Sequence, residues 1–183
     1  MASRAVPAPL AQLPNALTIA RLALIPLFVV LELRGEAGHS WAAAVVFAVA
    51  GVTDQVDGWL ARRWAVESQF GKVFDPLADR LMIDAAVILL WLDGRLPWAA
   101  LAVIVARDLL LVAGYKLLEP RGADLDVHVV GKVATWILYA SLGFVLATKD
   151  GTEWPLWLFW IGLGLALAAF AIYARDAWRV IRR

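Results

Sequence analysis

The chain has 183 residues, 62% of them hydrophobic, and its mean hydropathy is +0.73. Soluble domains are roughly half apolar, so this composition excludes an ordinary soluble protein and indicates a membrane protein. The formal net charge of +1 gives no reason to expect a nucleic-acid partner, and the absence of cysteine excludes disulfides and thiolate metal ligands.

Six stretches are long and apolar enough to cross a membrane as helices, since one span needs roughly 20 mostly apolar residues. In chain order they cover about 16–34, 42–61, 73–92, 97–118, 129–148 and 154–174. The runs are continuous and rich in Leu and Ala, unlike the alternating strands of about 10 residues in transmembrane β-barrels. We therefore expect an all-α membrane protein, a single six-transmembrane-helix bundle over residues 1–183.

The first span follows a short segment, residues 1–13, which we expect to lie at the membrane interface. Asn15 is the expected N-cap of the first helix. The apolar run after it is long and lacks a small-residue cleavage site, which favours a retained helix over a signal peptide. Arg21 lies one or two turns inside, where an arginine is costly unless it is paired or faces a polar cavity. Two interpretations stay open: Arg21 reaches back to the interface, or it lies inside the bundle.

The distribution of Lys and Arg predicts the orientation of the spans, because cytoplasmic connections carry an excess of these residues. With six spans, both termini lie on one side, together with the connections after the second and fourth spans. Eleven of the basic residues fall on that side: Arg4, Arg62, Arg63, Lys72, Lys116, Arg121, Lys132, Arg175, Arg179, Arg182 and Arg183. Three fall on the other: Arg34, Arg95 and Lys149. We therefore expect a protein of the cell membrane with both termini and the functional site in the cytoplasm.

The second and third spans carry polar residues at steps of three or four, which places them on shared helix faces. The second span contributes Asp54, Asp57, Gly58, Ala61 and Arg62, and the third contributes Gly71, Asp75 and Asp79. The first set comes late in one span and the second set early in the next, so a tight connection brings them together. Four carboxylates this close cannot all stay charged without cations. The spacing therefore predicts a metal site.

Ligands made only of carboxylates suit hard cations such as Mg²⁺ or Mn²⁺. Two divalent cations would offset four aspartates, and metal pairs roughly 4 Å apart serve phosphoryl chemistry. Gly58, Ala61 and Gly71 lack bulk on the same faces, which serves either helix packing or close approach of a substrate. Because these small residues recur on the same helix faces as the aspartates, we favour close approach of a substrate over helix packing. Arg62 has the planar geometry that matches a diphosphate.

Several charged residues lie beyond this motif. Arg80 follows Asp79 directly and is expected to balance the acidic cluster. Arg107 and Asp108 are adjacent in the middle of the fourth span, as an internal ion pair or as part of the substrate cavity. Lys132 opens the fifth span near the cytoplasmic interface.

Two further features concern the membrane interface. Many of the ten tryptophans flank the predicted spans, as expected of an interfacial belt. Residues 175–183 form a basic, amphipathic C-terminal tail, which we expect to contact anionic membrane lipids.

The order of the eight motif residues is similar to the signature of the CDP-alcohol phosphotransferase family, also called the CDP-alcohol phosphatidyltransferases. It reads aspartate-x-x-aspartate-glycine-x-x-alanine-arginine, eight residues, then glycine-x-x-x-aspartate-x-x-x-aspartate, and the chain matches every position. The resemblance continues through Pro14-Asn15-Ala-Leu17-Thr18-Ile-Ala-Arg21 and Gly131-Lys132, and so covers nearly the whole chain.

The resemblance implies a homodimeric enzyme with six transmembrane helices, in which an alcohol hydroxyl displaces CMP from a CDP-linked lipid. By likeness to the family, Asp54, Asp57 and Asp75 hold metal, and Asp79 takes the acceptor proton and also contributes to metal binding. The family positions that bind the CDP-lipid correspond to Asp54, Gly58, Ala61, Arg62 and Gly71. The implied substrates are CDP-diacylglycerol and a glycerol-containing acceptor, and the implied cofactors are two Mg²⁺ or Mn²⁺ ions.

Within the family, the chain is most similar to the glycerol-phospholipid branch. The acceptor is suggested by two positions at which the chain differs from the phosphatidylglycerophosphate synthases of that branch. Phosphatidylglycerophosphate synthases commonly show arginine-glutamate in the fourth helix and glycine-lysine-x-lysine-threonine before the fifth. Here these places read Arg107-Asp108 and Gly131-Lys132-Val-Ala134-Thr135. The loss of a cation where a phosphomonoester would bind favours phosphatidylglycerol, the acceptor of cardiolipin synthases, over glycerol 3-phosphate. The candidate acceptor-binding residues are Arg107, Lys132 and Arg21.

A divalent-cation transporter is the alternative from another class, since carboxylates inside a membrane often mark ion paths. Such a protein would not need the small residues and Arg62 in phase with the aspartates. It would also need a second acidic cluster along the path, and the sequence shows none.

Overall fold

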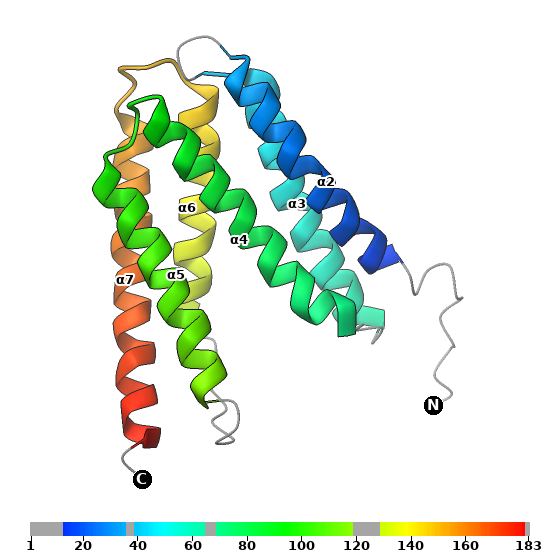
Figure 1. Ribbon diagram of the computed structural model, residues 1–183, viewed down its shortest axis with the longest axis vertical. Coiled ribbons are helices and arrows are strands. Elements are labelled where there is room, and N and C mark those ends of the chain that lie inside the picture. Colours follow the sequence, from blue (N-terminus) through cyan, green and yellow to red (C-terminus); the bar gives the residue numbers. More distant parts are fainter. Residues whose placement is uncertain (1–12, 36–38, 65–68, 119–128, 182–183) are drawn as a thin grey trace.

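The computed structural model describes residues 13–35, 39–64, 69–118 and 129–181. Within these ranges it describes the side chains except at 13–15, 54–64, 69–77, 79, 112, 115–118 and 179–181. The described residues form helices α2 (Leu13–Leu33), α3 (Trp41–Trp64), α4 (Gln69–Leu92), α5 (Trp98–Leu118), α6 (Val129–Ala147) and α7 (Trp154–Ile181), as Figure 1 shows. The predicted all-α class is confirmed, and each predicted span corresponds to one of these helices.

Among the residues whose side chains are described, three helices are long and apolar enough to cross a membrane: α2 over Ala16–Leu33, α6 over Val129–Ala147 and α7 over Trp154–Trp178. These helices mark the chain, by length and composition, as an integral membrane protein. In the part of α3 whose side chains are described, Trp41–Thr53 form a shorter apolar helix. The sequence of the remaining turns of α3 contains the charged residues Asp54, Asp57, Arg62 and Arg63. The count of six spans stays a prediction.

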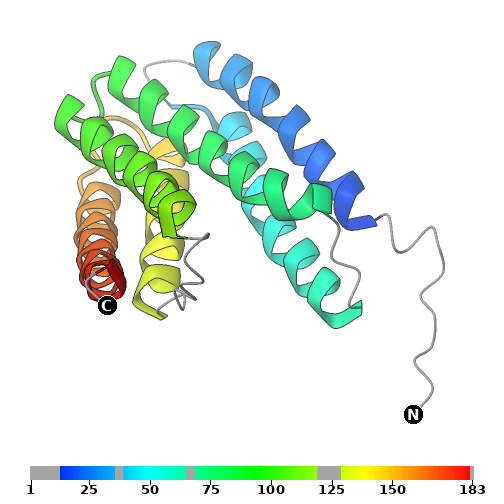
Figure 2. The ribbon, with the colours of Figure 1, turned by 60° about the horizontal axis from the view of Figure 1, so that its bottom comes forward.

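Consecutive helices run antiparallel, so the connections alternate between two ends of the bundle (Figures 1 and 2). One end, which we call the motif end, holds the starts of α2, α4 and α6 and the ends of α3, α5 and α7. The opposite end holds the ends of α2, α4 and α6 and the starts of α3, α5 and α7. Helix α2 packs on α3 and α4, α6 packs on α7, and α3 also contacts α6.

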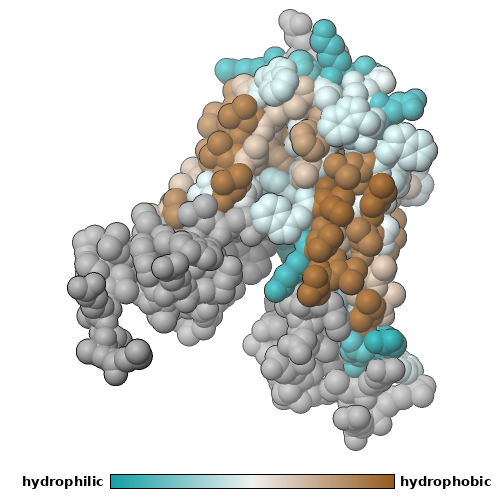
Figure 3. All heavy atoms as spheres, turned by 180° about the vertical axis from the view of Figure 1, so that it is seen from behind, coloured by the Kyte–Doolittle hydropathy of each residue, from teal (hydrophilic) through white to brown (hydrophobic). Residues whose placement is uncertain are grey.

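The core joins these helices through side chains that are almost entirely buried, among them Phe28, Phe47, Met82, Leu90, Leu142 and Phe159. Exposed large apolar residues cover the outer faces, as expected where lipid is the solvent. Figure 3 shows hydrophobic residues along the length of the helices and hydrophilic residues gathered at the opposite end. Trp41, Trp98 and Trp154, each the first residue of a helix at that end, are exposed, which supports the predicted interfacial belt.

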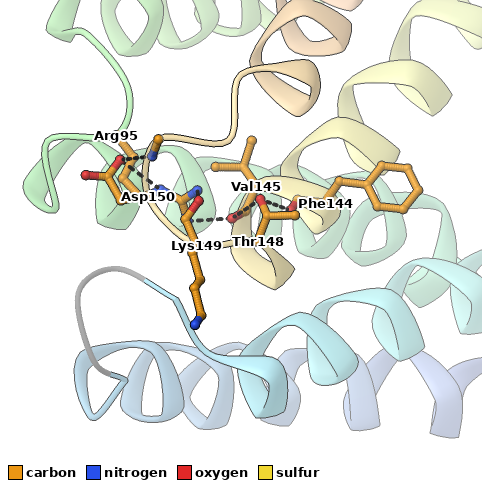
Figure 4. Close-up of polar contacts among 7 residues, drawn as sticks. Arg95, Phe144, Val145, Thr148, Lys149 and Asp150 are labelled. Atoms are coloured by element: carbon orange, nitrogen blue, oxygen red, sulfur yellow. Dashed lines mark hydrogen bonds and ion pairs between the residues drawn. The ribbon is translucent and has the colours of Figure 1, made fainter.

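Arg95 links the turn between α4 and α5 to the turn between α6 and α7 at the opposite end of the bundle (Figure 4). It is buried although it lies in the turn between α4 and α5, and its Nη1 donates a hydrogen bond of 2.5 Å to the carbonyl oxygen of Val145. Its Nη2 donates to the carbonyl of Lys149 at 3.4 Å, and its Nε lies 4.0 Å from a carboxylate oxygen of Asp150. The turn itself depends on Gly94, whose φ of +73° is easily reached only by glycine. Helices α4, α6 and α7 are thus held at the end far from the motif.

Candidate functional site

The backbone places both halves of the acidic motif at one end of the bundle. Asp54 to Arg62 lie in the last turns of α3, and Gly71 to Asp79 lie in the first half of α4. The two helices contact one another, and the end of α3 and the start of α4 both lie at the motif end (Figure 1). The side chains of all eight motif residues lie outside the described residues. Their predicted roles in metal and CDP-lipid binding stay predictions.

The donor set of the motif fits a hard divalent cation. Four carboxylates come from two helices that contact each other, and the chain has no cysteine that would favour zinc. Among the side chains that the structure describes, no group of three or more His, Cys, Asp or Glu residues could hold a metal ion. The prediction of a metal site in this chain therefore depends on the four motif aspartates.

A cluster of charged residues begins directly after Asp79. Arg80 on α4 places its Nη1 2.8 Å from a carboxylate oxygen of Asp108 on α5. Arg107 places its own Nη1 3.0 Å from the same oxygen, which is the ion pair that the sequence proposed as one of two interpretations. Asp108 is only 9% exposed. One buried carboxylate thus joins two arginines and links α4 to α5 next to the proposed catalytic position.

Two more residues belong to this charged cluster. Asp84, one turn beyond Arg80 on α4, interacts electrostatically with both Asp108 and Arg80. Tyr173 on α7 interacts in the same way with Arg107. Among the described residues, one carboxylate oxygen of Asp84 and the Nε of Arg107 are buried without a hydrogen-bond partner. The described part of the cluster therefore holds two arginines and two aspartates.

The expectation for Arg80 was incomplete. The sequence suggested that this residue balances the preceding aspartates, whereas the described partner of its guanidinium is Asp108. Helical spacing could not reveal this contact, because the two residues lie on different helices. The available signal was that both are charged residues within apolar segments, where such groups need partners.

The three candidate acceptor-binding residues lie on three helices. Arg107 belongs to the charged cluster on α5, and Lys132 is exposed at the start of α6. Arg21 is only 1% exposed in α2, so the interpretation that it reaches back to the interface is wrong. It lies inside the bundle, with the fully buried Thr18 one turn before it. Among the described residues, α2, α5 and α6 do not pack extensively on one another, and a shared acceptor site for these three residues stays a prediction.

We expect Asp108→Asn to destabilise the protein by about 3 kcal/mol, because it removes the shared counter-charge of two partly buried arginines. For a chain of this length the midpoint of thermal unfolding in detergent would fall by roughly 6–12 °C. Asp93→Asn is the matched control, since Asp93 is exposed in the turn after α4 and exposed charges contribute about 0–1 kcal/mol. Equal small shifts for both variants would contradict the structural role of Asp108.

The chain is similar to a known group of enzymes over most of its length. Residues 11–168 match the family model described as CDP-alcohol phosphatidyltransferase. The chain is 33% identical over 166 residues to the CDP-diacylglycerol--glycerol-3-phosphate 3-phosphatidyltransferase of Bacillus subtilis, covering 80% of this chain and 86% of that protein. An enzyme of the same name from Shigella flexneri serotype 5b is 32% identical over 161 residues, or 86% of each chain.

A relative with a different name is similar to the same extent. The cardiolipin synthase (CMP-forming) of Streptomyces coelicolor is 39% identical over 148 residues, which cover 78% of this chain and 67% of that protein. The relatives therefore carry two names: one states glycerol 3-phosphate, and the other states cardiolipin as the product and CMP as released.

Proposed function

Because the chain belongs to the CDP-alcohol phosphatidyltransferase family, we propose that it transfers the phosphatidyl group of CDP-diacylglycerol to a glycerol-type hydroxyl and releases CMP. The family match fixes the class, a phosphatidyltransferase of phospholipid biosynthesis, and removes the cation-transporter alternative. The observation that carries the proposed reaction is the placement of the complete motif on two contacting helices at one end of the bundle.

In the proposed reaction the acceptor oxygen attacks the phosphorus of the phosphatidyl group, and the bond from that phosphorus to the oxygen of CMP breaks. We assign to Asp79 the role of accepting the hydroxyl proton as the new bond forms. Asp54, Asp57, Asp75 and Asp79 would hold two divalent cations, Mg²⁺ or Mn²⁺, which neutralise charge on the diphosphate and the leaving CMP.

The remaining motif residues would bind and orient the CDP-lipid. Arg62 has the planar guanidinium that pairs with phosphate oxygens, so we assign it to the diphosphate. Gly58, Ala61 and Gly71 have little or no side chain on the faces that carry the aspartates, which would let the nucleotide approach the helix backbones. Orientation of the diphosphate between two helices would align the attacking and leaving oxygens.

We propose that all six helices cross the cell membrane with the motif end in the cytoplasm, where CMP is released. The antiparallel order of the helices and the excess of Lys and Arg near the motif end support this orientation. The exposed apolar faces would contact membrane lipid, and a homodimer is proposed from the family likeness alone.

Phosphatidylglycerol is the acceptor that we favour, with glycerol 3-phosphate as the alternative. In α6 the position that is commonly a second lysine in phosphatidylglycerophosphate synthases is Ala134, which is fully buried in the core. The hydroxyl of Thr135 donates to the carbonyl oxygen of Gly131 within the same helix at 3.0 Å. Lys132 alone therefore offers a cation at this turn, which suits an acceptor with a phosphodiester better than one with a more highly charged phosphomonoester.

The test is to incubate the purified protein with CDP-diacylglycerol and either acceptor, and to identify the lipid product by mass spectrometry. We expect cardiolipin together with CMP when phosphatidylglycerol is supplied. Formation of phosphatidylglycerophosphate instead would assign the alternative acceptor. Absence of CMP release with either acceptor would contradict the proposed reaction.

A further inference from the structure

Helix α3 carries a glycine one turn before the first aspartate of the motif, and a tyrosine of α6 occupies the space beside it. A Cβ atom built on Gly51 would lie 2.6 Å from Cζ and 3.0 Å from Cδ1 of the Tyr139 ring, and closer still to Cε1. The first of these distances is one that real Cβ atoms do not show, so no other residue fits at position 51 unless the ring moves. The tyrosine ring thus lies directly against the backbone of α3.

Tyr139 also binds α3 by a hydrogen bond and by ring stacking. Its hydroxyl donates to the carbonyl oxygen of Phe47 at 2.7 Å. Its ring stacks on the ring of Phe47 with centroids 4.2 Å apart and planes inclined by 20°. In an α-helix the carbonyl of residue 47 also accepts from the N–H of residue 51, so Tyr139 contacts both ends of one backbone hydrogen bond. These contacts restrict both the translation of α3 along its own axis and its rotation about that axis, relative to α6.

The turn held in this way leads directly into the metal-ligand candidates. Asp54 is three residues beyond Gly51 on the same continuous helix, and Asp57 is one turn further. A small rotation or shift of α3 at Gly51 would therefore be transmitted to both aspartates. Reactions that depend on ligand geometry are sensitive to displacements of roughly 1 Å.

We propose that Tyr139 is a positioning residue for the reaction: its contact with Gly51 and Phe47 sets the placement of Asp54 and Asp57 and so the affinity for the divalent cation. The inference rests on the proposed function. It gives α6 a role in cation binding although no motif aspartate lies on that helix.

A second glycine in the same interface supplies a matched control. Gly143 of α6 also faces Phe47, but a Cβ on Gly143 would lie 3.7 Å from the nearest atom of that ring, an ordinary van der Waals contact. Gly143→Ala should therefore be accommodated, whereas Gly51→Ala should displace either Tyr139 or α3. The two variants add the same methyl group between the same two helices.

The experiment measures Mn²⁺ binding to the purified protein in detergent, with the free Mn²⁺ signal in electron paramagnetic resonance as the readout, alongside CMP release. Tyr139→Phe removes the hydrogen bond and keeps the ring, and we expect it to weaken Mn²⁺ binding by roughly 2- to 30-fold, the range for residues that act on a site without touching its ligand. Activity at saturating Mn²⁺ should then recover to within about twofold of the unmodified protein. Gly143→Ala should bind Mn²⁺ like the unmodified protein.

A pair of variants separates positioning from general packing. We expect Gly51→Ala to weaken Mn²⁺ binding at least as much as Tyr139→Phe, and to add little further weakening when combined with Tyr139→Ala, which removes the ring atoms that the methyl group meets. Unchanged Mn²⁺ binding in both Tyr139→Phe and Gly51→Ala would overturn the proposal. Equal loss in Gly143→Ala, or reduced thermal stability with unchanged Mn²⁺ affinity, would likewise overturn it. Lack of CMP release by the unmodified protein would instead refute the proposed function and leave the binding comparison valid.

Discussion

Replacement of Asp79 by asparagine is expected to lower CMP release from CDP-diacylglycerol by about 10²–10⁴-fold or more. An amide has nearly the same shape as the carboxylate but cannot accept the proton of the acceptor hydroxyl, and the loss of a general base alone costs this much. The substitution also removes one of the four negative ligands proposed for the cations. The measurement is CMP release at saturating CDP-diacylglycerol and acceptor, with helical content followed by circular dichroism.

Asp93→Asn is the control for this variant. Asp93 is exposed in the turn at the other end of α4, so the same chemical change there lies far from the motif and should leave turnover unchanged. Near-normal turnover of Asp79→Asn would exclude Asp79 as the base. A loss of helical content in Asp79→Asn alone would show that the carboxylate is needed for folding, contrary to the expectation.

The helices could be predicted from sequence because lipid imposes a simple rule: a long apolar run must form its backbone hydrogen bonds within itself. The rule is weakest where charge interrupts the run. Helix α4 begins at Gln69, a few residues before the predicted 73, and α7 continues to Ile181, beyond the predicted end at 174. Residues such as Ala174, Arg175 and Ala177 are good helix formers, so part of the predicted C-terminal tail is helical.

The motif could also be recognised from the sequence, because its residues are neighbours along the chain; that they share helix faces stays a prediction from helical periodicity. The contacts around the motif could not be predicted. Tyr139 donates to a carbonyl 92 positions earlier, and Arg95 to one 50 positions later. Such pairs depend on how the helices pack and leave no periodic trace in the sequence. The sequence placed Arg95 in a connection between spans, for example, but did not reveal that it is buried and donates hydrogen bonds to α6 and to the following turn.

Removal of divalent cations is the second change for which we expect a near-complete loss of activity. EDTA should stop CMP release, and Mg²⁺ or Mn²⁺ added in excess should restore it. The physical reason is that transfer of a phosphatidyl group places negative charge on both diphosphate and leaving group beside four motif carboxylates, which would repel that charge unless cations lay between them. Arg62 is the one basic residue of the motif itself. Activity that is indifferent to chelation would reject the metal mechanism.

The cation should also raise the thermal stability of the protein. This effect distinguishes a cation bound by the protein itself from one that arrives bound to the substrate. Four carboxylates at one end of the bundle repel one another when no cation is present, so Mg²⁺ should stabilise the protein without any lipid substrate. A cation at 100 times its dissociation constant adds about 2.7 kcal/mol per site, which raises the midpoint of thermal unfolding in detergent. Asp75→Asn should lose much of this rise, whereas Asp93→Asn should keep it, because only the first is a proposed ligand. An Mg²⁺-dependent rise of equal size in both variants would place the cation elsewhere in the molecule.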